Sequence, residues 1–490
     1  MSGTAQALLG GPAGAGAAPG GVASGGVAPG GASEAGAGWV HPAASVTEYT
    51  PRGVRVLDAA ALVAGVAERA EQWAGHGFAP GDRVLVGTGS RLTTLLDVAA
   101  AWEAGLVPVL LSDALAPDSY RLLAAATGAV AGRLTPAVAR TWAARGSGPL
   151  TRDAGTVLLR LDGEPCTGGP PYDEPSLVLA TSGSTGLPKA VVHRRSRLLR
   201  NAGMHWDSVG GLGPGDRYLL SQSMYFSSAF VCGVLGVLAV GAELALIEPP
   251  FATANWFDAG RGFGATHTAL TPHLLMRVLD SGERFPASLR QVTVGGDRLG
   301  RTALTELRAR GVPDVRTTYG LTEAGPRVAT HTPGGTAHDG GLGRPLAGVS
   351  WRLGPDGELV VRTPTAQAGG YTDGAYVPYA AGDEVPTGDI CEELPDGTYR
   401  LIGRARRVTS VAGEKVFLGL VERVLADHPE VSAARVAADG EKGLAAQILP
   451  RPGGAGVDAA ELRRWCRGRL RAVEVPRTFT LVDPSTQLSK

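Results

Sequence analysis

The residues of this chain that are best suited to chemistry lie in one short stretch, from Thr181 to Lys189. Two glycines, Gly183 and Gly186, let the backbone turn its N–H groups toward a ligand without a Cβ in the way. Lys189 adds a positive charge. Hydroxyl groups add further donors, from Thr181, Ser182, Ser184 and Thr185. This combination predicts a loop that binds a polyanion such as the phosphates of a nucleotide.

The spacing of this loop differs from that of the common P-loop. In G-x-x-x-x-G-K-[ST] the second glycine directly precedes the lysine, whereas here Leu187 and Pro188 lie between them. The alternative is a flexible linker rich in Gly, Ser and Thr. Apolar runs on both sides, at 177–180 and 190–192, favour a loop between two strands instead.

Two more apolar runs end in small or polar residues. Residues 292–294 lead into Gly295, Gly296 and Asp297, and a helix is predicted after them at 302–310. Residues 319–323 show the same pattern of a strand end followed by small or polar residues. In a parallel-type sheet the three strand ends would converge on one crevice at the carboxyl edge. Open α/β sheets bind their ligands there.

The elements around these runs alternate. A helix is predicted over 57–73, a strand over 84–86, a second helix over 95–104 and a strand over 107–111, as in an α/β fold. Residues 135–175 have little periodicity beyond a short strand near 157–159. From Gly340 short strands and tight turns predict a β-rich subdomain. After Gly403 comes a small α+β module, with predicted strands at 408–411, 433–437 and 479–482 and helices at 420–426 and 459–470.

Composition narrows the class of protein. The 490 residues are 44% hydrophobic, and 46 basic side chains balance 46 acidic ones, which gives no reason to expect nucleic acid or a membrane surface as partner. The longest uncharged run, 218–242, contains several serines and a glutamine, so a buried strand and helix is favoured over a membrane span. The four cysteines lie far apart in the sequence and form no C-x-x-C pair, which argues against a zinc site and against a disulfide framework. A reducing, cytoplasmic location fits this best. The cysteines are Cys166, Cys232, Cys391 and Cys466.

The first 38 residues differ from the rest. They are almost entirely Gly, Ala, Pro, Ser and Val, with no aromatic residue before Trp39 and no Lys or Arg before Arg52. Such a segment cannot build a packed core, and it lacks the basic start of a secretory signal. We expect residues 1–38 to form a disordered tail.

Several motifs together resemble the adenylate-forming, or AMP-binding, superfamily, which includes acyl-CoA synthetases, aryl-acid ligases, peptide-synthetase adenylation domains and luciferases. The loop at 181–189 reads T-S-G-S-T-G-x-P-K, residues 77–84 read G-x-x-P-G-D-x-V, and 319–323 read Y-G-x-T-E. Thr387-Gly388-Asp389 and Gly403-Arg404 follow in the family's order. The resemblance extends from about Val54 to Lys490.

The resemblance implies a fold and its domains. It implies a large α/β N-terminal domain over 39–402, with two parallel-type sheets, helices and the β-rich subdomain. A small mobile α+β domain over 403–490 would follow. In the family the small domain rotates between an adenylation pose and a thioester-forming pose. The pivot position, which is Asp or Lys in the family, is Arg406 here.

The resemblance also implies roles for single residues. The loop from Thr181 to Lys189 would hold the β- and γ-phosphates of ATP, Thr322 would contact the α-phosphate and Glu323 would ligate Mg²⁺. Asp389 would accept hydrogen bonds from the ribose hydroxyls, and Arg404 would meet the ribose and a phosphate. The remaining residues implied for ATP are Gly295, Gly296, Asp297, Thr318, Tyr319 and Gly320.

The last residue is implied as catalytic. Lys490 aligns with the family's P-x-T-x-x-G-K, whose lysine reaches the substrate carboxylate and the α-phosphate, although Ser489 replaces the glycine and the sequence ends at the lysine. The alternative is that Lys490 is a frayed chain end without a catalytic role, and that Arg406 or Arg407 supplies the cation.

The acid substrate is constrained by one segment. Peptide-synthetase domains carry an aspartate after the phosphate loop for the substrate's α-ammonium group, and Met224–Cys232 contains no acidic residue, which argues against an α-amino acid. An aromatic and small-polar pocket fits an aryl or short acyl acid, the alternative for these residues being core packing. Its predicted lining is Tyr225, Phe226, Ser227, Ser228, Cys232, Val294 and Ala324.

Together with these residues, the resemblance implies an ATP- and Mg²⁺-dependent ligase that forms an acyl-adenylate from a small acid and passes the acyl group to CoA or a carrier-protein thiol. Two alternatives remain at this point. One is adenylation with another second step, either amide formation or activation of nitrite to diazotise an aryl amine. The other is a catalytically silent nucleotide-binding protein.

Overall fold

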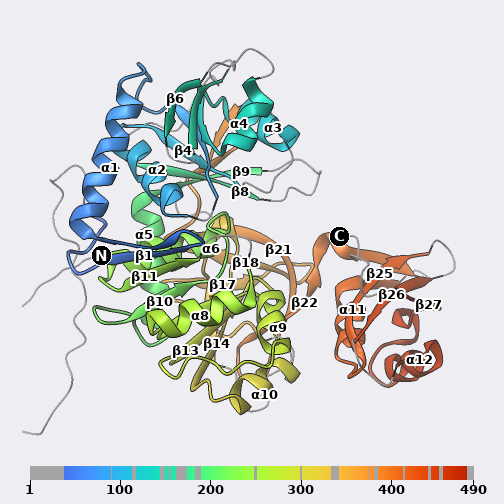
Figure 1. Ribbon diagram of the computed structural model, residues 1–490. Helices are drawn as coiled ribbons and strands as arrows, with labels where there is room; N and C mark the ends of the chain where they lie inside the picture. The colour runs from blue at the N-terminus through green and yellow to red at the C-terminus, as the bar shows by residue number, and fades with distance from the viewer. Residues whose placement is uncertain are drawn as a thin grey trace, which may run out of the picture. The chain divides into compact units, whose positions relative to one another are not determined.

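The structure is a computed structural model (Figure 1). It describes residues 38–89, 91–112, 117–143, 149–153, 156–161, 174–181, 189–247, 251–297, 299, 301–332, 341–372, 375–379, 384–411, 414–439, 443–451 and 456–482. The predicted tail, apart from Gly38, lies outside these residues.

Sheet A has nine strands in the order β16-β15-β14-β13-β12-β10-β11-β1-β2. The strands from β14 to β1 run parallel to one another, and antiparallel pairs flank them. The central strands are short apolar runs because both faces of the sheet are covered. Its strands are β1 (Ser45–Thr50), β2 (Gly53–Asp58), β10 (Arg217–Leu220), β11 (Glu243–Ile247), β12 (His267–Leu270), β13 (Gln291–Gly295), β14 (Asp314–Tyr319), β15 (Ala329–His331) and β16 (Arg344–Pro345).

Sheet B also has nine strands, in the order β20-β19-β9-β8-β4-β3-β5-β7-β6. Strands β8, β4, β3 and β5 are parallel and the outer pairs are antiparallel. Its strands are β3 (Arg83–Gly87), β4 (Val107–Leu110), β5 (Ala131–Leu134), β6 (Pro149–Asp153), β7 (Thr156–Arg160), β8 (Ser176–Thr181), β9 (Lys189–Arg194), β19 (Gly369–Thr372) and β20 (Ala375–Pro378).

Helices cover both sheets and join them through one core. Leu95 of α2 and Leu198 of α5 belong to a buried cluster that also contains Val84 of β3 and Leu244 of β11. Separate clusters join α8, α9 and α10 to sheet A and α3 and α4 to sheet B; Figure 1 shows α8, α9 and α10 beside β13 and β14. The helices are α1 (Ala59–Ala74), α2 (Leu92–Glu103), α3 (Pro117–Thr127), α4 (Pro136–Ala143), α5 (Arg195–Ser208), α8 (Thr253–Phe263), α9 (Pro272–Asp280) and α10 (Arg301–Ala309).

The uncharged run 218–242 forms a strand and a helix, as predicted. After β10 come α6 (Ser227–Phe230), a π-helical turn (Val231–Leu235) and α7 (Gly236–Ala239). A Cβ on Gly233 would lie 2.9 Å from Leu220 Cδ1, and one on Gly236 would lie 2.8 Å from Ala202 Cβ. Glycine at both positions therefore lets this segment pack closely against β10 and α5.

Two smaller parts follow. Sheet C, which is the predicted β-rich region, has the order β17-β18-β21-β22. The C-terminal module forms its own buried cluster, in which Val421, Leu462 and Cys466 pack against a three-stranded sheet. The elements are β17 (Ser350–Leu353), β18 (Glu358–Arg362), β21 (Glu384–Glu393), β22 (Tyr399–Arg404), β23 (Val408–Val411), β24 (Glu414–Phe417), α11 (Leu418–Ala426), β25 (Val431–Ala438), β26 (Leu444–Pro450), α12 (Ala459–Arg467) and β27 (Thr478–Leu481).

The prediction that three small-residue strand ends share one sheet is wrong. β13 and β14 are parallel neighbours in sheet A, but β8 belongs to sheet B, where it pairs with β4 and β9. The cause is that an apolar run encodes a strand but not its partner. Strand pairing is decided by long-range packing, which the local pattern does not contain.

Three smaller differences concern element bounds. The helix predicted from residue 57 begins at Ala59, because Leu57 and Asp58 still belong to β2 and the Asp58 side chain accepts a hydrogen bond from Ala61 N at 2.8 Å. The stretch 135–175 also contains α4 and β6, and the C-terminal module also contains β24 and β26. In the part of the chain that the structure describes, no helix is long and apolar enough to cross a membrane.

Candidate active site

The predicted phosphate loop joins two paired strands. β8 ends at Thr181 and β9 begins at Lys189, and these two residues are partners in an antiparallel register. Lys189 is exposed. The strands therefore bring the two ends of the loop opposite each other. The residues between them lie outside the described residues, namely Ser182, Gly183, Ser184, Thr185 and Gly186.

The ends of β13 and β14 lie side by side at the carboxyl edge of sheet A. Gly295 is the register partner of Thr318. A Cβ on Gly295 would lie 2.3 Å from Thr318 Oγ1, and one on Gly320 would lie 1.9 Å from the carbonyl oxygen of Pro326. Both positions therefore require glycine. Gly296 and Asp297 follow β13 and are exposed.

Thr322 and Glu323 lie in a short 3₁₀ turn, Thr322–Ala324, that is held from three directions. His193 Nε2 donates to the Thr322 carbonyl at 2.7 Å. The hydroxyl oxygens of Thr322 and Ser227 are 3.0 Å apart, and Gln367 N donates to the Glu323 carbonyl at 2.9 Å. The backbone of the turn is thus fixed by sheet B and by the segment before β19, and the Thr322 side chain contacts α6.

The Glu323 side chain suits a hard cation. It is half-buried, and within the described residues its carboxylate has no hydrogen bond or ion pair. Those residues contain no cluster of three His, Cys, Asp or Glu side chains that could hold a metal alone. Mg²⁺ is commonly bound by one or two carboxylates together with substrate phosphates. Glu323 therefore fits a Mg²⁺ ion whose other ligands come from ATP and water.

Asp389, the predicted ribose ligand, lies almost fully buried on β21. Tyr319 Oη donates to its Oδ2 at 2.6 Å, and Arg404 Nε on β22 lies 2.7 Å from its Oδ1. Burial raises the pKa of Asp389, although Arg404 and the Tyr319 hydrogen bond oppose this. The Arg404 side chain is 58% exposed. It can therefore swing away and free a carboxylate oxygen for a hydroxyl group.

The predicted acid-binding residues divide into two groups. Phe226 is 50% exposed and Ser227 and Ser228 are half-buried, while Tyr225 lies against the core of sheet B. In contrast, the other three side chains are buried in hydrophobic clusters, where core packing accounts for them: Cys232, Val294 and Ala324.

Lys490 lies outside the described residues, as does the rest of its motif. One of its two suggested substitutes is already engaged. Both terminal nitrogens of Arg407 donate to Glu422, at 2.6 and 2.8 Å, and one also donates to the Val436 carbonyl. Arg407 is therefore held within the C-terminal module and is not a free cation for the reaction.

Three residues that the sequence analysis did not single out support the site. His193 binds the Thr322 carbonyl, Asn201 makes two hydrogen bonds to the backbone of Arg327, and Arg327 donates to Thr318 Oγ1 at 2.6 Å. His193 follows the phosphate loop closely, which is a signal that could have been used. Arg327 likewise follows the motif at 319–323 closely. Asn201 has no such signal, because Arg327 is 126 positions away from it in sequence.

The burial of His193 predicts how the stability of the protein depends on pH. The ring is buried, and burial lowers its pKa to about 4, with Arg197 adding to the effect and the hydrogen bond to Thr322 opposing it. The unfolded chain then takes up a proton more readily than the folded one, so stability falls as pH decreases through 6.5 toward 4. We expect protonation of His193 in the unfolded chain to lower the free energy of unfolding by about 1 kcal/mol when the pH falls from 7 to about 5.5.

The measurement is urea unfolding at these two pH values. His193→Gln keeps a donor for the Thr322 carbonyl but cannot titrate. Between the two pH values the free energy of unfolding of this variant should therefore fall by about 1 kcal/mol less than that of the wild type. His273→Gln, which changes an exposed histidine on α9, should retain the wild-type pH dependence. An unaltered pH dependence in His193→Gln would show that this ring is not buried in its neutral form.

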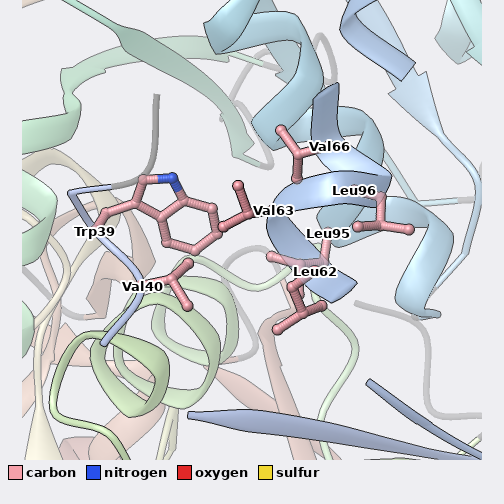
Figure 2. Close-up of a pocket in the computed structure, with 7 residues that line it drawn as sticks. All are labelled: Trp39, Val40, Leu62, Val63, Val66, Leu95 and Leu96. Atoms are coloured by element: carbon pink, nitrogen blue, oxygen red, sulfur yellow. The ribbon is translucent and has the colours of Figure 1, made fainter. Parts of the chain in front are cut away.

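An apolar pocket elsewhere on the surface contains none of these residues. Figure 2 shows Trp39 and Val40 facing side chains of α1 and α2. Its other lining residues are Leu62, Val63, Val66, Leu95 and Leu96. A polyanion needs hydrogen-bond donors and positive charge. This pocket therefore does not suit ATP.

Comparison with known proteins places these features in context. The family described as AMP-binding enzyme matches residues 64–372, and the AMP-binding enzyme C-terminal domain matches residues 420–490. A 2-succinylbenzoate–CoA ligase of Geobacillus kaustophilus is 30% identical over 336 residues, which is 64% of this chain. The match spans 66% of that ligase, slightly less than two thirds of its length.

Two further similarities cover most of the chain. A feruloyl-CoA synthase of Amycolatopsis is 28% identical over 469 residues, which is 89% of this chain and 93% of that protein. The solved structure of o-succinylbenzoate coenzyme A synthetase from Bacillus subtilis, in complex with ATP and magnesium ion, superimposes with a TM-score of 0.73 at 21% identity. It covers 89% of this chain and 92% of the other, which shows a shared fold.

Proposed function

Because the chain belongs to the AMP-binding enzyme family of adenylate-forming ligases, we propose that it activates a small carboxylic acid with ATP and transfers the acyl group to a thiol. In the first step the carboxylate attacks the α-phosphorus of ATP, an acyl-adenylate forms and pyrophosphate leaves. In the second step the thiol of CoA or of a carrier protein attacks the acyl carbon, and AMP leaves.

One observation carries this proposal. The segment Tyr319–Glu323 contacts two predicted binding regions at once: Tyr319 Oη is 2.6 Å from Asp389, and the Thr322 hydroxyl is 3.0 Å from that of Ser227. The first contact marks the predicted ribose position and the second the predicted acid position. An adenylation site needs the acid next to the ribose 5′ side, where the α-phosphate lies.

The charged groups suit the other end of the nucleotide. Lys189 at the start of β9 is exposed and available to a phosphate, and Glu323 would hold Mg²⁺ together with phosphate oxygens. When bound, the ion neutralises negative charge on the phosphates and so lets a second anion approach. Lys490 would supply the cation between the carboxylate and the α-phosphate.

The acid is proposed to be an aryl or short acyl acid. The 2-succinylbenzoate–CoA ligase and the feruloyl-CoA synthase are named for aryl acids and for CoA as acceptor, which supports both choices. The absence of acidic side chains in Met224–Cys232 supports the exclusion of α-amino acids. We further propose 403–490 as the small domain that moves between the two steps.

The proposal is tested by acid-dependent exchange of labelled pyrophosphate into ATP with a panel of aryl acids, acyl acids, α-amino acids and nitrite. We expect exchange with at least one aryl or acyl acid, and thioester formation when CoA or a carrier thiol is added. Exchange with nitrite alone would indicate activation of nitrite, and a product formed only with amines would indicate amide formation, in place of transfer to a thiol. Absence of exchange with every acid, while AMP still binds, would contradict catalysis.

A further inference from the structure

A buried arginine lies behind the predicted acid pocket. Arg327 is only 4% exposed. Its backbone is fixed by Asn201, whose Oδ1 accepts from Arg327 N at 2.9 Å and whose Nδ2 donates to Arg327 O at 2.8 Å. Within the described residues no carboxylate forms an ion pair with its guanidinium, and its Nε has no hydrogen-bond partner.

The groups around this guanidinium are neutral. Nη1 donates to Thr318 Oγ1 at 2.6 Å, and the guanidinium lies close enough to the Cys232 thiol to oppose the rise in its pKa. Burial raises the pKa of Cys232 to about 11 and raises that of Tyr218, while burial lowers the pKa of His205 well below its usual value. At neutral pH none of these neighbours supplies a negative charge.

A buried charge without a counter-charge is unfavourable because it has lost its hydration and gained no ion pair. Arginine has a second property that bears on this position. Its planar fork presents parallel N–H groups that match a carboxylate, a sulfonate or a phosphonate. A ligand anion at this point would satisfy both the charge and the unpaired donor.

The guanidinium is well placed to meet such a ligand. A Cβ on Gly295 would lie 2.7 Å from Arg327 Nη1, so the fork lies against the end of β13 at the carboxyl edge of sheet A. The segment 227–232 contacts Thr322 at its start, through the Ser227 hydroxyl, and ends at Cys232, which is near enough to Arg327 for the guanidinium to influence its pKa. The cation thus lies beyond the position predicted for the reacting carboxylate, toward the far end of the acid.

We propose that Arg327 binds a second anionic group at the far end of the acid, so that the substrate is a dicarboxylate or a carboxylate bearing a sulfonate or phosphonate. This inference rests on the proposed function, since it assigns the specificity of the same pocket. It adds a charged group, at the far end of the aryl or short acyl acid, to what the pocket selects.

The test uses pairs of acids that differ only in the distant group. Each dicarboxylic acid, aliphatic or aromatic, is compared with the monoacid that lacks the far carboxylate, in ATP–pyrophosphate exchange by the full-length protein. In the wild type we expect the best diacid to exceed its monoacid in kcat/KM by at least roughly tenfold. Arg327→Gln should abolish this preference, mainly through KM, so that the diacid and its monoacid become equal in kcat/KM.

Two variants serve as controls. Arg327→Lys keeps the charge but loses the fork, so it should retain part of the preference for the diacid. Arg290→Gln changes an exposed arginine next to the start of β13, at the opposite edge of the sheet, and should behave as the wild type. An equal diacid preference in wild type and Arg327→Gln, or a wild-type preference for monoacids, would overturn the proposal.

Binding is measured separately from turnover. With AMP saturating, diacids should raise the melting temperature of the wild type more than that of Arg327→Gln, and monoacids should affect both alike. If no acid supports exchange but this difference is present, the proposed function fails while the anion site stands. If exchange occurs but neither diacid effect is present, the anion site fails alone. If Arg327→Gln does not fold, Arg327→Lys takes its place in the comparison. The site is then contradicted if diacids and monoacids raise the melting temperature equally, both in the wild type and in Arg327→Lys.

Discussion

Replacing Glu323 by glutamine is expected to reduce ATP–pyrophosphate exchange by roughly three orders of magnitude. The amide has almost the same size as the carboxylate and can make the same packing contacts. It lacks the negative charge that binds a hard cation in place of water. The backbone of the turn should not change, because it is held by His193 and Gln367 through the carbonyl groups of Thr322 and Glu323.

The measurement is a titration of exchange activity with Mg²⁺, together with AMP binding in the absence of metal. Glu323→Gln should need far more Mg²⁺ and should still bind AMP. Glu283→Gln, a change of an exposed carboxylate that contacts Arg261, is the matched control and should keep wild-type activity. Exchange that persists in Glu323→Gln with an unchanged Mg²⁺ requirement would mean that Glu323 is not the ligand.

Replacing Lys490 by alanine should lower adenylate formation by roughly two to three orders of magnitude while ATP binding changes little. Its ammonium group would stabilise charge that develops between the carboxylate and the α-phosphate, which is a contact made mostly in the transition state. Thioester formation from a supplied acyl-adenylate should be nearly unaffected, because adenylation has then already occurred. Single-turnover measurements of the two half-reactions check this.

Lys490→Arg provides the control, since it keeps the charge and should retain part of the first half-reaction. Equal losses in both half-reactions of Lys490→Ala would indicate damage to the C-terminal module instead. No loss in either would mean that the terminal lysine has no catalytic role. Arg407 could not then take over without breaking its two hydrogen bonds to Glu422.

The elements of the site could be predicted where the signal is local. The strand that ends at Thr181 and the one that ends at Gly295 both show as apolar runs followed by small residues, and both exist. The family resemblance rests on such local motifs and is confirmed by the match over residues 64–372. Local patterns also predicted the strand and helix within 218–242.

Features that depend on distant contacts could not be predicted. The hydrogen bond between His193 and the Thr322 carbonyl joins residues 129 positions apart, and the assignment of β8 to sheet B depends on its pairing with β4. In a sequence Arg327 resembles any surface arginine, because most arginines are exposed. Its burial arises from α5, β14 and the π-helical turn, which only the folded chain brings together.

The most direct test of adenylation follows the oxygen of the acid. An acid with ¹⁸O in both carboxylate oxygens is incubated with the wild-type protein, ATP, Mg²⁺ and the thiol acceptor, and the nucleotide product is analysed by mass spectrometry. If the carboxylate attacks the α-phosphorus, one labelled oxygen remains on the phosphate when the acyl group leaves, so the product is AMP that carries one ¹⁸O. Formation of ADP, or of AMP without label, would contradict an acyl-adenylate intermediate.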